Sequence, residues 1–184
     1  MRKVNILITA AGGDIGANII NILSQQKDAN LCLVGTDLSK NIFAIDKLDK
    51  FYEVCRSNDI NYKKRILDII QKNSIEIVIP VSEPEIIWFN NNMSIFIELN
   101  IKVLINNKNI IDSFFNKLET SIKLNKIDVK TPKTFLFSEF NNQLNFPLIL
   151  KSNYSINSKD IYIIENEQQL KYLKISRLVY LILF

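Results

Sequence analysis

Short runs of consecutive apolar residues alternate with amphipathic segments from the start of the chain to about residue 115. An unbroken apolar run is typical of a parallel strand that is buried on both faces, whereas apolar residues at helical spacing indicate a helix with one buried side. Strands are predicted at residues 4–9, 31–35, 51–55, 75–80 and 102–105, and helices at about residues 14–26, 61–72, 82–99 and 107–115. This alternation predicts an α/β domain with a Rossmann-like parallel sheet.

The pattern changes near Pro132, after which short apolar runs are separated by polar returns. We therefore divide the chain into a Rossmann-like domain at residues 1–113 and an α+β unit at residues 114–184, which begins with a helix predicted to end near Asn125. The last residues, 178–184, are all apolar. Such an end favours either a truncated reading frame or a tail that docks on a partner chain or on a second copy.

The composition is that of a globular protein, with 47% hydrophobic and 23% charged residues. The net charge of +4 comes from scattered lysines, and the basic run 63–65 is expected to be solvated, so neither nucleic-acid nor membrane binding is expected. The chain contains no histidine, which excludes Ser-His and Cys-His pairs and histidine metal sites. Cys32 and Cys55 lack metal-ligand spacing and fit the reduced thiols of a cytoplasmic protein.

A glycine turn follows the first predicted strand and opens a helix. Gly12, Gly13 and Asp14 lie where backbone amides and the helix dipole favour an anion. Asp37 ends the second strand, the place of a ribose-binding acid in a dinucleotide fold. However, Ala10 takes the place of the first glycine, and no tyrosine has a lysine four residues later, as short-chain dehydrogenases do. We favour a turn that packs the helix against the sheet over a cofactor site.

Two acidic residues, Glu83 and Glu85, follow the fourth predicted strand at the edge of the sheet where α/β proteins bind ligands. They could contact a substrate amine, or they could stabilise the start of a helix for which Ser82 is the predicted N-cap. The helix-start interpretation is preferred on the sequence alone.

A lysine closes the apolar run 147–150, a polar loop follows, and a second apolar run returns at 161–164. This is the frame of a hairpin that covers a nucleotide phosphate, with Lys151 at the end of its first strand. Lys117, at the start of a predicted helix, is a second candidate for a phosphate contact, although it could equally be an exposed lysine in a lysine-rich chain.

In their order and spacing, these residues resemble the start of an ATP-grasp enzyme of the carbamoyl phosphate synthetase large-subunit-like group. The resemblance covers residues 1 to about 172 and is carried by residues 9–16, 35–37, 79–80, 116–120, 131–134, 146–151 and 158–159. It implies a pre-ATP-grasp domain that helps to bind a small-molecule carboxylate, followed by the first part of a domain that binds ATP with Mg²⁺. The family reaction forms an acyl phosphate, which an amine or another nucleophile attacks.

The resemblance also implies roles for individual residues. By position, Lys117 reaches the nucleotide, Lys151 contacts its phosphates, and Ser158 and Lys159 lie in the loop above them. The candidate substrate-binding residues are Gly12, Gly13, Asp14, Asp37, Glu83 and Glu85.

The chain departs from the family pattern at several places. Ser155, Asn157 and Asp160 stand where the family loop has glycines, and Ser152 stands where a proline is usual. The adenine hinge, the second subdomain and the residues that hold Mg²⁺ are not in this sequence, so no metal ligand is assigned. We expect a truncated ATP-grasp protein that is inactive as an isolated chain and binds Mg-ATP weakly or not at all. The alternatives are a non-catalytic binding or assembly module and an NAD(P)-binding Rossmann oxidoreductase.

Overall fold

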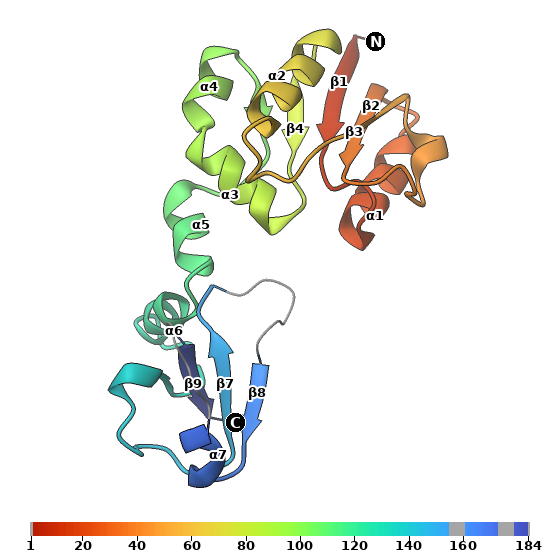
Figure 1. Cartoon of the computed structure of the whole chain (residues 1–184). Coiled ribbons are helices and arrows are strands. Elements are labelled where there is room, and N and C mark those ends of the chain that lie inside the picture. The colour runs from red at the N-terminus through yellow and green to blue at the C-terminus, as the bar shows by residue number, and fades with distance from the viewer. Residues whose placement is uncertain (1, 155–160, 173–178, 184) are drawn as a thin grey trace. The chain divides into compact units, whose positions relative to one another are not determined.

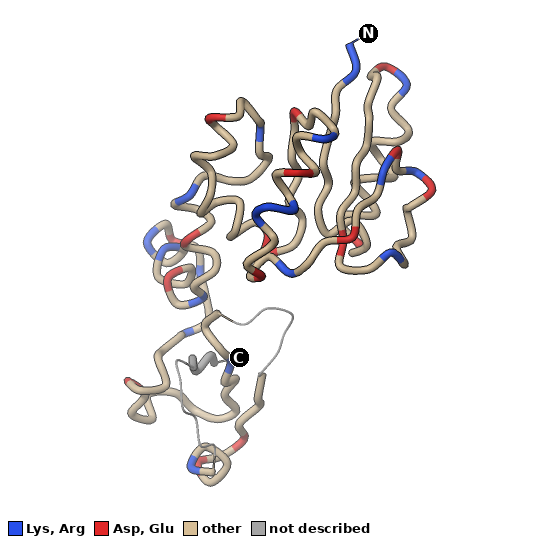
Figure 2. Tube along the Cα trace, turned by 45° about the horizontal axis from the view of Figure 1, so that its top comes forward, with Lys and Arg blue, Asp and Glu red and all other residues tan. Residues whose placement is uncertain are grey.

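The computed structural model describes residues 2–154, 161–172 and 179–183 (Figure 1). It divides into two compact units, Met1–Asn106 and Asn107–Phe184. In the tube of Figure 2, basic and acidic residues are spread along both units and are not gathered on one element. No helix in the described ranges is both long and apolar enough to cross a membrane.

The first unit is built on a five-stranded sheet in the order β3-β2-β1-β4-β5, and every strand pair in it is parallel. The central strand β1 pairs with β2 on one side and with β4 on the other, so that Ile6 lies beside both Leu33 and Ile77. The strands are β1 (Lys3–Ile8), β2 (Asn30–Asp37), β3 (Lys50–Glu53), β4 (Ile77–Ile79) and β5 (Lys102–Val103). The predicted Rossmann-like α/β fold is confirmed.

Helices cover both faces of this sheet. Alternate residues of β1 enter two separate cores, because successive side chains of a strand point to opposite faces. Ile6 and Ile8 pack in one core with Ile20 of α1, whereas Leu7 packs in the other with Ile66 of α2. The helices are α1 (Asp14–Ser24), α2 (Tyr62–Lys72), α3 (Glu83–Asn91) and α4 (Met93–Glu98), and a 3₁₀ turn, η1, covers Ile45–Lys47.

The single helix predicted over residues 82–99 is wrong, since the chain forms α3 and α4 with a break at Asn92. The Asn92 side chain donates a hydrogen bond to the Trp88 carbonyl at 2.8 Å. Such a local bond from side chain to backbone competes with the hydrogen bonds of a continuing helix. The break allows Phe96 of α4 to turn back onto Phe89 of α3, with ring centroids 4.9 Å apart. Both rings are fully buried.

The second unit contains a four-stranded antiparallel sheet in the order β6-β9-β7-β8. Its core holds Leu148 and Leu150 of β7 and Ile164 of β8, with Leu144 and several phenylalanines packed against them. The elements are α5 (Lys108–Phe114), α6 (Lys117–Asn125), β6 (Thr134–Leu136), η2 (Phe137–Glu139), β7 (Leu148–Ser152), β8 (Ile161–Ile164), α7 (Glu167–Tyr172) and β9 (Val179–Leu183).

Residues of the apolar tail lie inside this sheet. Val179–Leu183 form β9, which pairs with β6 on one side and with β7 on the other. Because their backbone is hydrogen-bonded on both sides within the chain, these residues offer no free strand edge to a partner chain, and docking of the predicted tail stays a prediction.

The turn between β1 and α1 requires a glycine at position 16 for reasons of space. A Cβ atom on Gly16 would lie 2.4 Å from the Ala10 carbonyl oxygen and 2.9 Å from the Ala11 Cα atom, which are both backbone atoms. At Gly13, in contrast, the nearest atom to an added Cβ lies 3.7 Å away.

We therefore expect Gly16→Ala to lower the free energy of unfolding by about 1–3 kcal/mol, because the helix must move away from the turn. The matched variant Gly13→Ala is expected to cost less than about 1 kcal/mol, since only an N-cap preference is lost there. Urea denaturation followed by circular dichroism measures both changes. Equal stability of the two variants would contradict this packing role.

Candidate functional site

The strand order places a ligand-binding edge at the carboxyl ends of β1 and β4. From β1 the chain proceeds to β2 on one side, whereas β4 lies on the other side. Open α/β sheets bind ligands at such a topological switch point. The residue after β1, Thr9, donates its backbone N–H to Ile79 of β4 at 3.1 Å, which joins the two strand ends.

A buried carboxylate fills this switch point. Glu85 of α3 is 7% exposed and accepts hydrogen bonds from three hydroxyl groups. The Tyr62 hydroxyl donates to Oε1 at 2.7 Å. The Thr9 and Ser82 hydroxyls donate to Oε2 at 2.9 Å and 2.6 Å. A buried carboxylate is costly unless its oxygens are hydrogen-bonded, and both oxygens of Glu85 are.

This network corrects the predicted role of Ser82. Ser82 is the N-cap residue of α3, as expected, but its hydroxyl forms no hydrogen bond to the backbone of the helix. It donates to Glu85 instead. The arrangement favours a structural role for Glu85 over contact with a substrate amine. Glu83 lies half-buried in the first turn of the same helix.

Tyr62 stands at the centre of the same network, at the start of α2. Burial, followed by the neighbouring Glu85 carboxylate and its hydrogen bond, raises the pKa of Tyr62 well above the ordinary value of 10.0. The phenol is therefore held in its neutral form, in which it can donate to Glu85.

The glycine turn is closed by Asp37, at the end of β2. The Gly12 N–H donates to Asp37 Oδ2 at 2.8 Å, and the Leu38 N–H donates to Oδ1 at 2.7 Å. A Cβ atom on Gly12 would lie 2.5 Å from Ile42 Cγ2, so the turn is packed tightly against the next loop. Ala10, in the place of the first glycine, has a φ of 47°, in the left-handed region that favours glycine.

The residues of the predicted glycine motif fall into two groups, those that hold the turn and those that remain exposed. Asp37 uses its carboxylate to hold the turn, where a dinucleotide fold would direct it at a ribose. Gly13 and Asp14 are exposed at the start of α1. The structure therefore brings Gly12 and Asp37 together and leaves Gly13 and Asp14 accessible at the same turn.

In the second unit, the start of α6 is bonded to the end of β7. Asn153, directly after β7, is 3% exposed and accepts the Lys117 N–H on its Oδ1 atom at 2.8 Å. The Lys117 ammonium group donates to the Asn153 carbonyl at 3.0 Å. Sequence reasoning missed Asn153, whose only signal is its place beyond the strand-end lysine. Lys117 thus lies at the end of the strand that carries Lys151, and the nucleotide contacts of both lysines stay a prediction.

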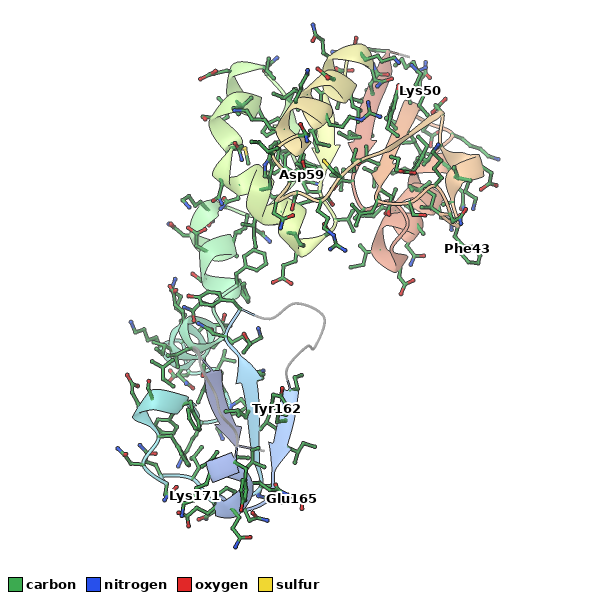
Figure 3. The ribbon with its side chains drawn as sticks, viewed as in Figure 1. Phe43, Lys50, Asp59, Tyr162, Glu165 and Lys171 are labelled. Carbon is green, nitrogen blue, oxygen red and sulfur yellow. The ribbon has the colours of Figure 1, made fainter. Side chains whose placement is uncertain are left out.

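Lys151 projects from a face of the sheet that the unit's core does not use. In β7 its neighbours Leu148 and Leu150 are buried in the core, whereas Lys151 pairs with Ile161 of β8, which is 44% exposed. Tyr162, the next residue of β8, is labelled in Figure 3. Ser158 and Lys159 lie outside the described residues, as do the positions of the loop where glycines were expected.

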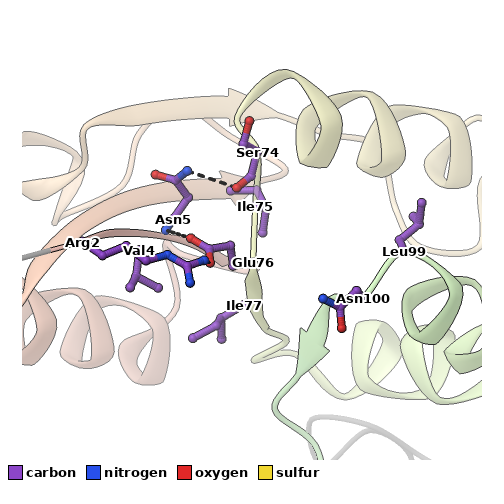
Figure 4. Close-up of a pocket in the computed structure, with 9 residues that line it drawn as sticks. All are labelled: Arg2, Val4, Asn5, Ser74, Ile75, Glu76, Ile77, Leu99 and Asn100. Carbon is purple, nitrogen blue, oxygen red and sulfur yellow. Dashed lines mark hydrogen bonds and ion pairs between the residues drawn. The ribbon is translucent and has the colours of Figure 1, made fainter.

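One open pocket of about 850 Å³ lies at the opposite, amino-terminal edge of the first sheet (Figure 4). Its two charged residues, Arg2 and Glu76, form an ion pair with each other, and the neutral Asn5 amide donates to the Ser74 carbonyl at 3.0 Å. It is therefore a weak candidate for a ligand site.

A second pocket of about 380 Å³ lies at the carboxyl end of β3, next to the start of α2. Its lining residues are Glu53, Val54, Cys55, Asn61 and Arg65. Sequence reasoning did not single out this pocket. Among the residues that the structure describes, no group of three or more acidic or cysteine side chains could hold a metal ion.

Comparison with known families assigns the first unit. The model of the PylC-like N-terminal domain matches residues 6–104. The chain belongs to the PylC-like N-terminal domain family. Comparison with curated protein sequences finds no match.

Solved structures share the fold of this PylC-like chain. N5-carboxyaminoimidazole synthetase from Staphylococcus aureus, complexed with ADP, matches 98% of the chain with a TM-score of 0.73 and 16% identity. The biotin carboxylase domain of Hydrogenobacter thermophilus 2-oxoglutarate carboxylase, in complex with MgADP, matches 100% with a TM-score of 0.71 and 15% identity. L-amino acid ligase from Bacillus licheniformis matches 100% with a TM-score of 0.71 and 14% identity.

The PylC-like chain covers 47%, 45% and 45% of these three chains, so it spans about half of their length. At such identities the likeness shows the fold, and the predicted pre-ATP-grasp fold is confirmed. The matches do not favour the Rossmann oxidoreductase alternative. The narrower grouping with carbamoyl phosphate synthetase stays a prediction.

Removal of the charge of Glu85 tests its structural role in the PylC-like domain. We expect Glu85→Gln to lower the free energy of unfolding by about 1–3 kcal/mol, because the buried hydroxyls of Thr9 and Tyr62 and the half-buried hydroxyl of Ser82 lose part of their acceptor. The exposed Glu98 at the end of α4 provides the control, and Glu98→Gln should stay within about 0.5 kcal/mol of the parent chain. Chemical denaturation near neutral pH measures both. If Glu85→Gln is as stable as the control, the carboxylate is not a structural anchor.

The raised pKa of Tyr62 predicts a loss of stability at alkaline pH. The unfolded chain releases this phenolic proton near pH 10 and the folded chain keeps it, so the contribution is complete below about pH 10 and falls by about 1.4 kcal/mol per pH unit above it. Tyr62→Phe should therefore show a shallower decline in the free energy of unfolding above this pH. Tyr172, which is 85% exposed, supplies the control Tyr172→Phe, whose decline should match the parent chain.

Proposed function

We propose that this chain forms the substrate-binding domain and the first nucleotide-binding segment of an ATP-grasp ligase, which activates a small carboxylate as an acyl phosphate for attack by an amine. One observation carries the proposal: Asn153 joins the start of α6, with Lys117, to the end of β7, with Lys151. Lys117 is therefore held at the end of the strand that carries Lys151, two residues before Asn153. Cations grouped in this way suit the phosphates of a nucleotide.

The fold supports this assignment. Two of the three named neighbours are complexes with ADP or MgADP, and all three are about twice as long as this chain. In the proposal, Lys151 contacts the phosphates from the sheet face, Lys117 reaches the nucleotide from α6, and Ser158 and Lys159 lie in the covering loop. The bound Mg²⁺ would neutralise the phosphates, with ligands from outside these residues.

The first unit supplies the substrate side of the proposal. Its carboxyl edge carries Gly13 and Asp14 in exposed positions and Glu83 in a half-buried position, beside the hydrogen-bonded Glu85 carboxylate and the Gly12–Asp37 pair. The proposal assigns these roles to the predicted domains at residues 1–113 and 114–184, although the two compact units meet at residues 106 and 107, so that α5 belongs to the second unit. The isolated chain would then bind nucleotide weakly and would not complete the reaction, because the remaining nucleotide and metal contacts come from elsewhere.

Nucleotide binding to the isolated chain tests the proposal. We expect Mg-ADP to bind with a dissociation constant of about 1 mM, corresponding to about −4 kcal/mol. Lys151→Met, which keeps the apolar stem and removes the charge, should weaken binding about tenfold through the loss of a charge-assisted hydrogen bond. Saturation-transfer NMR on the adenine protons measures these weak affinities.

Lys133 is exposed in the connector before β6, so Lys133→Met is the matched control and should bind as the parent chain does. No binding of Mg-ADP, or binding that Lys151→Met leaves unchanged, would contradict the proposed phosphate contact. A micromolar affinity would contradict the inference that much of the nucleotide site lies outside this chain.

A further inference from the structure

The pocket at the end of β3 combines two opposite charges in a small space. Its volume of about 380 Å³ falls at the small end of the range of about 300–1,000 Å³ that is usual for small-molecule sites. It opens at the carboxyl edge of the parallel sheet, where α/β folds bind their ligands. Glu53 is the last residue of β3, and Arg65 lies in α2.

The arginine is held in place and keeps donors for a ligand. Arg65 Nη2 donates to the Glu53 carbonyl at 3.3 Å, and its guanidinium carbon lies 5.7 Å from the centre of the Tyr52 ring. A guanidinium group has five N–H donors in a planar fork, which suits a carboxylate. Within the part of the chain that the structure describes, the Glu53 carbonyl is the hydrogen-bond acceptor found for this fork.

The glutamate provides the complementary charge. Glu53 is exposed, and its carboxylate takes part in none of the ion pairs among the described residues. Asp59, labelled in Figure 3 in the loop between β3 and α2, is committed to the Asn61 backbone and side chain at 2.8 Å and 3.1 Å. The pocket therefore offers one cation, Arg65, and one carboxylate, Glu53.

We propose that this pocket binds a small zwitterion that carries both a carboxylate and an ammonium group, such as a free α-amino acid. Arg65 holds the carboxylate of the ligand, Glu53 its ammonium group, and Val54 and Cys55 contact its apolar part. The inference rests on the proposed function in one respect, since a ligase of this class requires a carboxylate or an amine as substrate. It adds the place in the fold where such a substrate binds.

The charge pair also explains which ligands the pocket rejects. A simple anion would gain the attraction of Arg65 and meet the repulsion of Glu53, and a simple amine would experience the reverse. A ligand with both charges pairs with both residues. A ligand with one charge leaves either Arg65 or Glu53 unpaired, and this cost adds to the specificity for the zwitterion.

Cys55 provides a direct probe, because it lines the pocket and is half-buried, whereas Cys32 is buried with 7% exposure. The full chain is alkylated with iodoacetamide in the presence of each common L-amino acid, and modification of the two cysteines is followed by peptide mass spectrometry. At about ten times its dissociation constant, a bound amino acid should slow the alkylation of Cys55 about tenfold. The slow modification of Cys32 should not change.

Two analogues of a protecting amino acid, each lacking one of its two charges, test the contribution of each charge. The N-acetyl derivative keeps the carboxylate and the amide derivative keeps the ammonium group, and each should protect at least about tenfold less well than the zwitterion. Arg65→Gln should abolish protection and Glu53→Gln should reduce it. Lys64→Gln, at the exposed neighbour of Arg65, should leave it unchanged, and thermal unfolding verifies that each variant is folded.

The proposal is overturned if no common L-amino acid protects Cys55, if an N-acetyl derivative protects as well as its parent, or if protection survives Arg65→Gln. These outcomes leave the nucleotide site untouched, because Mg-ADP binding through Lys151 is measured separately in the second unit. Conversely, protection of Cys55 without binding of Mg-ADP would support the pocket and contradict the ligase assignment.

Discussion

The buried carboxylate of Glu85 is the interaction on which the first unit most depends. It lies where the strand order reverses, and it accepts hydroxyl groups from the end of β1, from the start of α2 and from the turn before α3. A charge in such a place is tolerated only when its oxygens are satisfied, so these three segments must take one relative arrangement. The carboxyl edge of the sheet is therefore rigid at its centre.

The Glu85 hydrogen bonds limit which parts of the carboxyl edge of the sheet can bind a ligand. In many α/β proteins the switch point is a binding crevice, but here the Glu85 network occupies it and the Asp37 carboxylate closes the glycine turn beside it. Polar groups that face solvent are found further along the same edge, at the end of β3 and the start of α2. The centre of the carboxyl edge is thus filled by internal hydrogen bonds, whereas the end of β3 and the start of α2 leave polar groups open to a ligand.

In the second unit, hydrogen bonds of Asn153 hold Lys117 at the end of strand β7. The buried side chain of Asn153 accepts the first amide of α6, and its carbonyl accepts the Lys117 ammonium group. A single asparagine therefore aligns the helix with the strand through its side chain and its carbonyl group. Lys151 lies in the same strand, on a face that carries exposed isoleucines and does not contribute to the core of the unit. Such a face is suited to contact with another molecule or segment.

The sequence by itself determined the alternation of strands and helices in the first unit, because continuous apolar runs such as the one around Leu7 mark strands buried on both faces. It also located the glycine turn, the strand-end Lys151 and the family resemblance, since these depend on local spacing. Only the tertiary structure decided that Glu85 is buried and hydrogen-bonded, that helix α3 ends at Asn91, that residues 179–183 pair within their own sheet, and that Glu53 and Arg65 line one pocket. Each of these depends on contacts between residues distant in the chain or on a side chain's choice between two partners, and local pattern carries no information about either.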